Sequence, residues 1–272
     1  MKIGFIGAGN MGGAIIKGYL NKQCKDSIQG GSRIYIYDSN LEKAREMSKE
    51  MNVNFTNSIG ELVSKCDIIF LAVKPNVYNS VLDEANKEFA VDKIIVSMAA
   101  GITMDHIQKH FNFPIKIIRI MPNTPALVNE SMTAVCMGKG VTESDMEIPL
   151  EILKAIGRVE LVDEDKIHAI IGVSGSSPAY AYMFIEAIAR AGEQKGLDYR
   201  LSLEMAAQSV LGASRMILET GKSPKELVEM VCSPNGTTIE AVKTLGTNGF
   251  NEKVTEAVFA AVEKSIKMSE AL

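Results

Sequence analysis

After Met1 the chain reads KIGFIGAGNMG over residues 2–12. The apolar run KIGFI is typical of a buried strand, and an apolar helical pattern follows the glycines. Between a strand and a helix each glycine has its own purpose: Gly7 permits a tight turn, Gly9 lets a ligand approach the backbone, and Gly12 allows close packing. The helix N-terminus would hold phosphates through free N–H groups and its dipole. We therefore predict a dinucleotide-binding loop, although a glycine turn without a ligand is the alternative. The loop comprises Gly7, Ala8, Gly9, Asn10, Met11 and Gly12.

Outward from this loop, strand-like and helix-like segments alternate up to residue 163. Runs rich in Ile, Val and Phe predict strands at 2–6, 33–37, 68–72, 94–97, 115–121 and 133–137. Helical patterns lie between them at 11–22, 41–51, 59–65, 76–88 and 103–110. Near-continuous apolar strands separated by helices are typical of a parallel sheet covered on both faces. The expected fold class is α/β, with a Rossmann-type parallel sheet domain over residues 1–163.

After residue 163 the strand-like runs disappear, and helix-length segments continue to the end of the chain. Residues 204–219 are apolar nearly all round, so a helix there must be buried on most sides. Either it lies inside its own helical bundle or a second subunit covers it, and we expect the second arrangement. The sequence thus predicts an all-helical C-terminal dimerisation domain over residues 164–272.

Composition excludes several classes of partner. The chain has 272 residues, a net charge of −4, no Trp and 6% aromatic residues, and it contains no basic tract. These properties argue against a nucleic-acid surface. No apolar stretch reaches the length of a membrane span, and the run after Met1 is too short for a signal peptide. We expect a cytoplasmic protein that binds neither nucleic acid nor membrane.

The sequence offers no convincing metal site. Its cysteines are scattered and form no C-x-x-C pair, so we expect mostly buried small side chains rather than disulfides or zinc ligands. His106 and His110 lie four residues apart, but the acid of an H-E-x-x-H motif is missing, so we predict that both are on the surface. The four cysteines are Cys24, Cys66, Cys136 and Cys232.

The second predicted strand ends at Asp38, followed by Ser39 and Asn40. An acid at this position usually bonds the ribose hydroxyls of NAD and repels the extra phosphate of NADP. Asp38 therefore favours NADH mildly, with Ser39 also at the cofactor, although Lys43 and Arg45 are close enough to accommodate a phosphate. Alternatively, Asp38 only begins the following turn.

Two further predicted strands end in small or turn-forming residues. Ligands of open parallel sheets bind beyond the carboxyl ends of the strands, so we expect cofactor contacts at both ends. Plain strand–loop turns are the alternative reading. The predicted contacts are Ala72, Val73, Lys74, Pro75, Ala99, Ala100 and Gly101.

Three more segments narrow the function: RIMPNTPALV at 119–128, GSSPAY at 175–180 and SPNGTTI at 233–239. In this order and spacing, together with the glycine loop and LAVKP at 71–75, they make the sequence resemble the pyrroline-5-carboxylate reductase family. The resemblance runs from Lys2 to about Gly249. The chain departs from the family at Ser177 and Asn235, where the family usually has Gly.

The resemblance implies reduction of 1-pyrroline-5-carboxylate to L-proline, the last step of proline biosynthesis, with NADPH or NADH. It implies two catalytic residues: Thr238, whose hydroxyl meets the ring nitrogen, and Ser233, which assists at the carboxylate. The loop backbone before a helix would hold that carboxylate. Simple N-capping by Ser or Thr is the alternative. The implied substrate-binding residues are Ser233, Asn235, Gly236, Thr237 and Thr238.

The resemblance also places Pro122, Asn123 and Pro178 near the nicotinamide. It implies a homodimer through the helical domain, or a decamer built from such dimers.

Two other functions fit the same two-domain plan. A reductase of another imine or of a β-hydroxyacid is one, but the β-hydroxyacid enzymes use a Lys on a long helix. Here the corresponding region reaches its first Lys only at Lys195. A binding protein with a regulatory role is the other. An intact phosphate loop and the pair Ser233 and Thr238 argue against lost catalysis.

Overall fold

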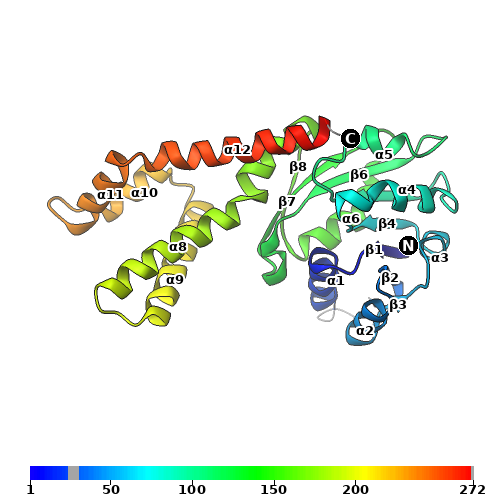
Figure 1. The fold of residues 1–272 in the computed structure, drawn as a ribbon, viewed down its shortest axis with the longest axis horizontal. Coiled ribbons are helices and arrows are strands. Elements are labelled where there is room, and N and C mark those ends of the chain that lie inside the picture. Colours follow the sequence, from blue (N-terminus) through cyan, green and yellow to red (C-terminus); the bar gives the residue numbers. More distant parts are fainter. Residues whose placement is uncertain (24–30, 271–272) are drawn as a thin grey trace. The chain divides into compact units, whose positions relative to one another are not determined.

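The computed structural model describes residues 1–23 and 31–270 (Figure 1). The chain forms two compact units: Met1–Gly175 together with Ala261–Leu272, and Ser176–Ala260. The second unit is therefore inserted into the first. The compact units divide at Gly175. The domain boundary expected at residue 163 stays a prediction. Of the predicted buried cysteines, Cys24 lies outside the described residues.

The first unit is built on a sheet that has eight strands in the described residues. The strands are β1 (Ile3–Ile6), β2 (Ile34–Tyr37), β3 (Asn54–Phe55), β4 (Ile68–Leu71), β5 (Ile94–Ser97), β6 (Lys116–Met121), β7 (Ser131–Met137) and β8 (Gly157–Leu161). Their order across the sheet is β3-β2-β1-β4-β5-β6-β7-β8. The order reverses between β1 and β4, which is the switch point where ligands of such sheets bind. The predicted Rossmann-type fold is confirmed, and each predicted strand is present.

The last two strands, β7 and β8, run against the other six. Every neighbouring pair is parallel except β6 and β7, in which Ile118 lies opposite Met137. A parallel return would need a crossover of a dozen or more residues, and only residues 122–130 separate the two strands. The predicted parallel sheet is therefore interrupted at β7. The sequence patterns also missed β8, whose alternating charged residues face outward at the sheet edge, and the two-residue β3.

Helices cover both faces of this sheet, as predicted. They are α1 (Asn10–Gln23), α2 (Leu41–Met51), α3 (Ile59–Lys65), α4 (Tyr78–Asn86), α5 (Met104–Gln108), α6 (Glu143–Lys154) and α7 (Ile167–Ile170). Apolar side chains of α1 and α6 form one core cluster with the sheet, and those of α3, α4 and α5 form the other. Four 3-10 helices, including η3 (Thr124–Val128) and η4 (Glu164–Lys166), and a π-helix at Ile171–Gly175 complete the described part of this unit.

Local signals explain why α2 and α3 begin where the sequence predicts. The side chain of Asn40 accepts a hydrogen bond from the Lys43 N–H, and Ser58 accepts one from the Glu61 N–H. Such N-caps satisfy backbone donors that a helix leaves open. The unpredicted helix α6 carries the same kind of signal, a reciprocal capping box between Thr142 and its third helical residue.

The second unit is helical, as predicted. It contains α8 (Ser177–Gln194), α9 (Tyr199–Thr220), α10 (Pro224–Val231), α11 (Thr237–Thr247) and the first half of α12 (Phe250–Glu270). Figure 1 shows α8 and α9 lying side by side, where the small residues Ala189, Ser202 and Ala206 are buried. Across the described residues of both units, no helix has the length and apolar character needed to cross a membrane.

The apolar side chains of α9 are not covered by the unit itself. Met205 is 55% exposed and Leu218 is 57% exposed, and Leu211 and Ile217 are exposed as well. The alternative that this helix lies inside its own bundle is therefore wrong. Covering by a second subunit stays a prediction.

Two glycines allow a test of the packing between β7 and β8. Gly157 has φ +147°, and a Cβ there would collide with the Ser131 backbone of β7; Gly140 has φ +75° and open space around it. We expect Gly157→Ala to lower the free energy of unfolding by about 3–5 kcal/mol, through strain and overpacking. Gly140→Ala should cost about 1–2 kcal/mol, through strain alone. Urea denaturation measures both, and equal losses would contradict the packing argument.

Candidate functional site

The glycine loop after β1 has the geometry that its sequence predicts. Gly7 has φ +104°, and a Cβ there would lie 2.6 Å from the Ala72 carbonyl oxygen. A Cβ at Gly12 would lie 2.5 Å from the Gly7 carbonyl oxygen, whereas a Cβ at Gly9 would meet no atom within 4 Å. Gly7 and Gly12 are thus required for backbone packing, and Gly9 leaves open space beside the first turn of α1. That open space is what a phosphate needs to approach the backbone.

Asp38 connects the end of β2 to this loop. Its Oδ2 accepts a hydrogen bond from the Ala8 N–H (2.8 Å), and its Oδ1 accepts one from the Asn40 N–H (3.0 Å). The second bond begins the turn into α2, so Asp38 does form this turn. A carboxylate has about four acceptor sites, so Asp38 keeps capacity for a ligand hydroxyl.

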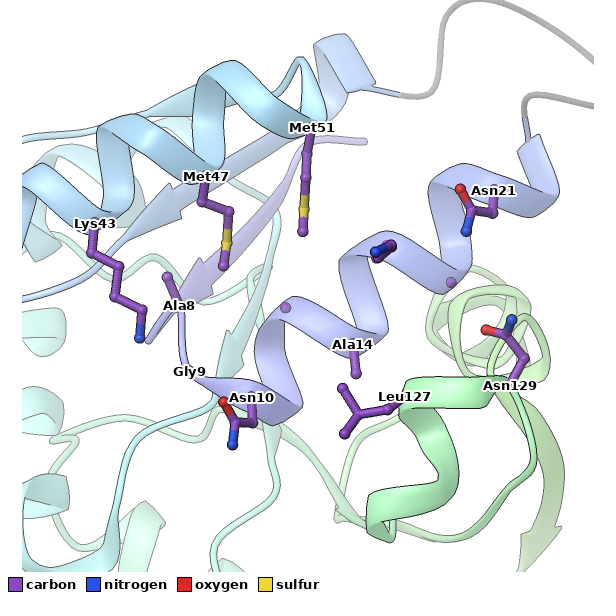
Figure 2. Close-up of a pocket in the computed structure, with 13 residues that line it drawn as sticks. Ala8, Gly9, Asn10, Ala14, Asn21, Lys43, Met47, Met51, Leu127 and Asn129 are labelled. Carbon is purple, nitrogen blue, oxygen red and sulfur yellow. The ribbon is translucent and has the colours of Figure 1, made fainter. Parts of the chain in front are cut away.

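Two cavities flank the loop. One of about 300 Å³ lies between α1 and α2, and Figure 2 shows Lys43 extending from α2 towards Ala8 and Gly9. Its lining residues are Ala8, Gly9, Asn10, Gly13, Ala14, Lys17, Gly18, Asn21, Lys43, Met47, Met51, Leu127 and Asn129. Most of these residues are not predicted by the sequence patterns, although those on α1 recur every three or four residues along one face of the helix.

The second cavity, of about 280 Å³, lies on the other side of the loop. It brings together four predicted cofactor residues, Gly7, Asp38, Ser39 and Val73. Unpredicted residues also line it: Tyr37, Val77, Ser80 and Glu84. Burial and the nearby carboxylates of Glu84 and Asp38 raise the pKa of Tyr37, so its phenol stays a neutral hydrogen-bonding group at neutral pH.

The predicted residues at the ends of β4 and β5 differ in exposure. Ala72, Val73 and Pro75 are half-buried and Lys74 is exposed, whereas Ala99 and Gly101 are buried. Gly101 has φ +83°, and a Cβ there would lie 3.2 Å from Cβ of Met268 near the end of α12. The chain's own C-terminal helix thus occupies the space beside Gly101. The assignment of these residues as cofactor contacts stays a prediction.

A buried polar cluster lies beneath this edge of the sheet. Arg119 on β6 is 1% exposed, and its Nη1 donates to Oε1 of Glu164 (2.7 Å), which also accepts from the Met104 N–H (2.8 Å). The neighbouring Tyr78 donates its O–H to Ser97 (2.7 Å), and burial raises the pKa of that phenol. The bonds of Glu164 thus connect β6 to the start of α5, and the bond of Tyr78 connects the end of β5 to the start of α4. A sequence signal existed, because an Arg inside an apolar strand run needs a buried partner.

The described cysteines and histidines form no metal site. Burial raises the pKa of Cys66 to about 12 and that of Cys136 to about 11, so both thiols stay protonated, while Cys232 is partly exposed. The rings of His106 and His110 are half-buried and bond to Asn79 and Asp83 instead of being fully solvated. Within the described ranges, no three His, Cys, Asp or Glu residues are grouped to hold a metal.

The predicted substrate loop lies in the second unit, before α11. Asn235 has φ +57°, Gly236 is the N-cap residue, and no side chain caps the helix. The alternative that Ser or Thr only caps this helix is therefore wrong. Thr237 and Thr238 are the first two residues of α11. Because no side chain caps this helix, the N–H groups of its first turn are available where a carboxylate is expected.

Pro178 is the second residue of α8, which follows the π-helix. The proline therefore lies at the point where the π-helix ends and α8 begins. Pro178 and the residues around Thr238 belong to the second unit, whereas the glycine loop belongs to the first.

The chain is similar to known proteins over almost its whole length. Residues 164–268 match a family model for pyrroline-5-carboxylate reductase dimerisation, and residues 2–101 match one for NADP oxidoreductase, coenzyme F420-dependent. The chain is 44% identical over 268 residues to the pyrroline-5-carboxylate reductase of Escherichia coli K12, covering 98% of each protein. The chain belongs to the pyrroline-5-carboxylate reductase family. The predicted family is confirmed.

Solved pyrroline-5-carboxylate reductases have the same fold. The structure from Coxiella burnetii is 32% identical with a TM-score of 0.90, covering 98% of each chain. That from Plasmodium falciparum, with NADP bound, is 31% identical with a TM-score of 0.88, covering 99% of this chain and 98% of that one. The predicted oxidoreductase class is thereby confirmed. The open space at Gly9 and the two cavities fit the nicotinamide dinucleotide that this class of enzyme uses.

The contrast between Gly9 and Gly12 gives a test of the loop in this reductase. We expect Gly9→Ala to change the free energy of unfolding by less than about 1 kcal/mol. Because the methyl group would fill the space for a phosphate, the Kd for NADPH or NADH should rise about 10-fold or more. Gly12→Ala should instead lower stability by about 1–3 kcal/mol, because its methyl group meets the Gly7 carbonyl. Nicotinamide fluorescence and thermal unfolding measure the two effects, and a stable Gly9→Ala protein with normal affinity would contradict this assignment.

Proposed function

We propose that this chain reduces the C=N bond of 1-pyrroline-5-carboxylate to give L-proline, the last step of proline biosynthesis, with NADPH or NADH. The observation that carries the proposal is the uncapped N-terminus of α11, which presents Thr238 and free N–H groups in a reductase whose glycine loop is intact. The family membership supports the same reaction. A β-hydroxyacid reductase is less well supported, because α8 contains no Lys and Lys195 is only its C-cap residue.

The residues of the α11 loop suit a cyclic imine that carries a carboxylate. The N–H groups of the first turn, at Thr237 and Thr238, can bind the carboxylate with help from the helix dipole. Ser233 lies against Gly236, because a Cβ at Gly236 would collide with the Ser233 hydroxyl. That hydroxyl is therefore beside the same turn and can assist at the carboxylate. Asn235 adopts the left-handed backbone conformation that Gly usually supplies, so this departure from the family pattern is tolerated.

Thr238 is proposed to hold the ring nitrogen. Its hydroxyl has ordinary acidity, so we infer that it orients the ring through a hydrogen bond and does not supply a proton. A bound NADPH or NADH would supply a hydride for the ring carbon, and a ring nitrogen already protonated by solvent would take up the C=N electron pair and become the amine of proline. The residues proposed to hold the dinucleotide are those of the glycine loop, Asp38 and Ser39, the predicted residues that follow β4 and β5, and Pro122 after β6.

A variant of Thr238 tests both the reaction and the residue. We expect the wild-type protein to oxidise NADPH or NADH when 1-pyrroline-5-carboxylate is added, and Thr238→Ala to lower turnover by about 10- to 1000-fold, because the ring loses its orienting bond. Absorbance of the reduced nicotinamide measures the rate. Thr247→Ala is the matched control, since that hydroxyl lies at the other end of α11 and bonds to its own helix. A wild-type protein that binds dinucleotide but shows no turnover would favour the binding-protein alternative.

The preference between the two cofactors depends on opposing charges. Asp38 lines the cavity on one side of the glycine loop and disfavours a 2′-phosphate, and Lys43 lines the cavity on the other side and favours one. Arg45 is less available, because its guanidinium lies 5.4 Å from the centre of the Phe55 ring. We propose that Asp38 gives a mild preference for NADH.

Removing the charge of Asp38 should reverse that preference. We expect Asp38→Asn to raise the ratio of kcat/KM for NADPH to that for NADH by about 10-fold, because a like-charge repulsion is lost. Lys43→Gln should lower the same ratio by about 3- to 10-fold. Steady-state kinetics with both cofactors measures the ratio, and an unchanged ratio in both variants would show that neither side chain reads the 2′ position.

The helical unit is proposed to form a homodimer. The support is the family model that spans it and the row of exposed apolar side chains on α9. Apolar surface of this extent is commonly an interface in soluble proteins. Assembly of such dimers into a decamer and a cytoplasmic location are parts of the same proposal.

A further inference from the structure

Asn123 stands directly before η3, where an Asn side chain ordinarily caps the helix that follows. It makes no such cap. Its Oδ1 instead accepts hydrogen bonds from the Met132 N–H (3.0 Å) and the Ser131 hydroxyl (3.1 Å), and its Nδ2 donates to the Ser174 carbonyl (3.0 Å). All three partners belong to the first unit, and Asn123 is only 8% exposed. The carboxamide therefore makes all three of these hydrogen bonds within the first unit.

The bond to Ser174 reaches the segment of chain that directly precedes the second unit. Ser174 lies in the π-helix Ile171–Gly175, and Gly175 is the last residue before the second unit begins. Carbonyls at the end of a helix have no partner within it and need one elsewhere. Asn123 supplies that partner, and it thereby fixes the π-helix to the end of β6. Single π-turns of this kind are frequent at functional sites.

The other partners extend the attachment into the sheet. The hydroxyl of Ser131 lies 3.2 Å from that of Thr133, and both side chains are buried on β7. Buried polar groups that satisfy one another favour one arrangement of the backbone, because any other would leave them without partners. Asn123 thus joins β6, β7 and the π-helix at the sheet edge where ligands of this fold bind.

We propose that Asn123 is a positioning residue, whose carboxamide locks the end of β6 to the π-helix instead of binding the dinucleotide. The proposal rests on the reductase function above, since the lock matters for catalysis only if hydride is transferred beside this edge. Displacements of about 1 Å can cost about 100-fold in rate without weakening binding. Loss of the lock should therefore lower kcat far more than it weakens dinucleotide binding.

Asn123→Asp is the most informative variant. It keeps the shape and both acceptor bonds, but it loses the N–H donor and directs a carboxylate at the Ser174 carbonyl. We expect kcat to fall about 10- to 100-fold while the Kd for the dinucleotide changes less than about 3-fold. Asn86→Asp, the same substitution at the last residue of α4, is the control and should leave both values unchanged. A Kd raised about 10-fold with kcat preserved at saturation would overturn the proposal and indicate that Asn123 binds the cofactor. A variant with an unchanged kcat and an unchanged Kd would also overturn the proposal.

Hydrogen exchange tests the attachment of the π-helix to the end of β6. It uses a second variant, Asn123→Ser, and does not depend on turnover. In Asn123→Ser, amides of the π-helix should exchange about 10-fold faster or more than in the wild type, while those of β1 exchange at an unchanged rate. Equal rates at the π-helix in the two proteins would overturn the proposal. If the wild type proves inactive towards 1-pyrroline-5-carboxylate, the reductase function fails, but the exchange and Kd measurements still decide whether Asn123 locks this segment or binds the dinucleotide.

Discussion

The ligand-facing edge of the sheet depends on how closely three backbones approach one another after β1. Gly7 lies against the Ala72 carbonyl at the end of β4, and Gly12 on α1 lies against the Gly7 carbonyl. A side chain at either glycine would force β4 or α1 to move away. Because these contacts hold α1 close to the sheet, its first N–H groups open towards the space at Gly9. The bond from Ala8 to Asp38 then fixes the end of β2 in the same cluster.

Much of this fold is predictable because its signals are local. All four residues of β1 and of β4 are buried, so their apolar runs predict strands without regard to what surrounds them. The caps of α2 and α3 are equally local, and the predicted bounds of both helices agree with the structure. Strand β8 escaped prediction because it is half exposed at an edge, where polar residues are tolerated. The direction of β7 follows from the length of a connection and leaves no mark on the composition of the strand itself.

In the candidate site too, the features set by neighbouring residues are predictable and those set by long-range contacts are not. The glycine loop and the start of α11 were found because a handful of neighbouring residues determine each of them. Glu164 lies 45 residues from Arg119, and Ser174 lies 51 residues from Asn123. Met268, which packs beside Gly101, lies in the last helix. No local pattern encodes such contacts. The segment around Asn123 was therefore recognised by family resemblance, but the bonds of its side chain became visible only in the folded unit.

The return of α12 into the first unit has a consequence for how the protein is made. Met268 packs beside Gly101, and Ser265 bonds to His168 (2.8 Å), so the unit that starts at the N-terminus is completed by the last turns of the chain. Domains that are continuous in sequence can fold on the ribosome as soon as they emerge. Here the loop at Gly101 stays uncovered until the second half of α12 has been synthesised and has left the exit tunnel. Loss of the last turns of α12 would therefore damage the unit that is translated first, not the one that is translated last.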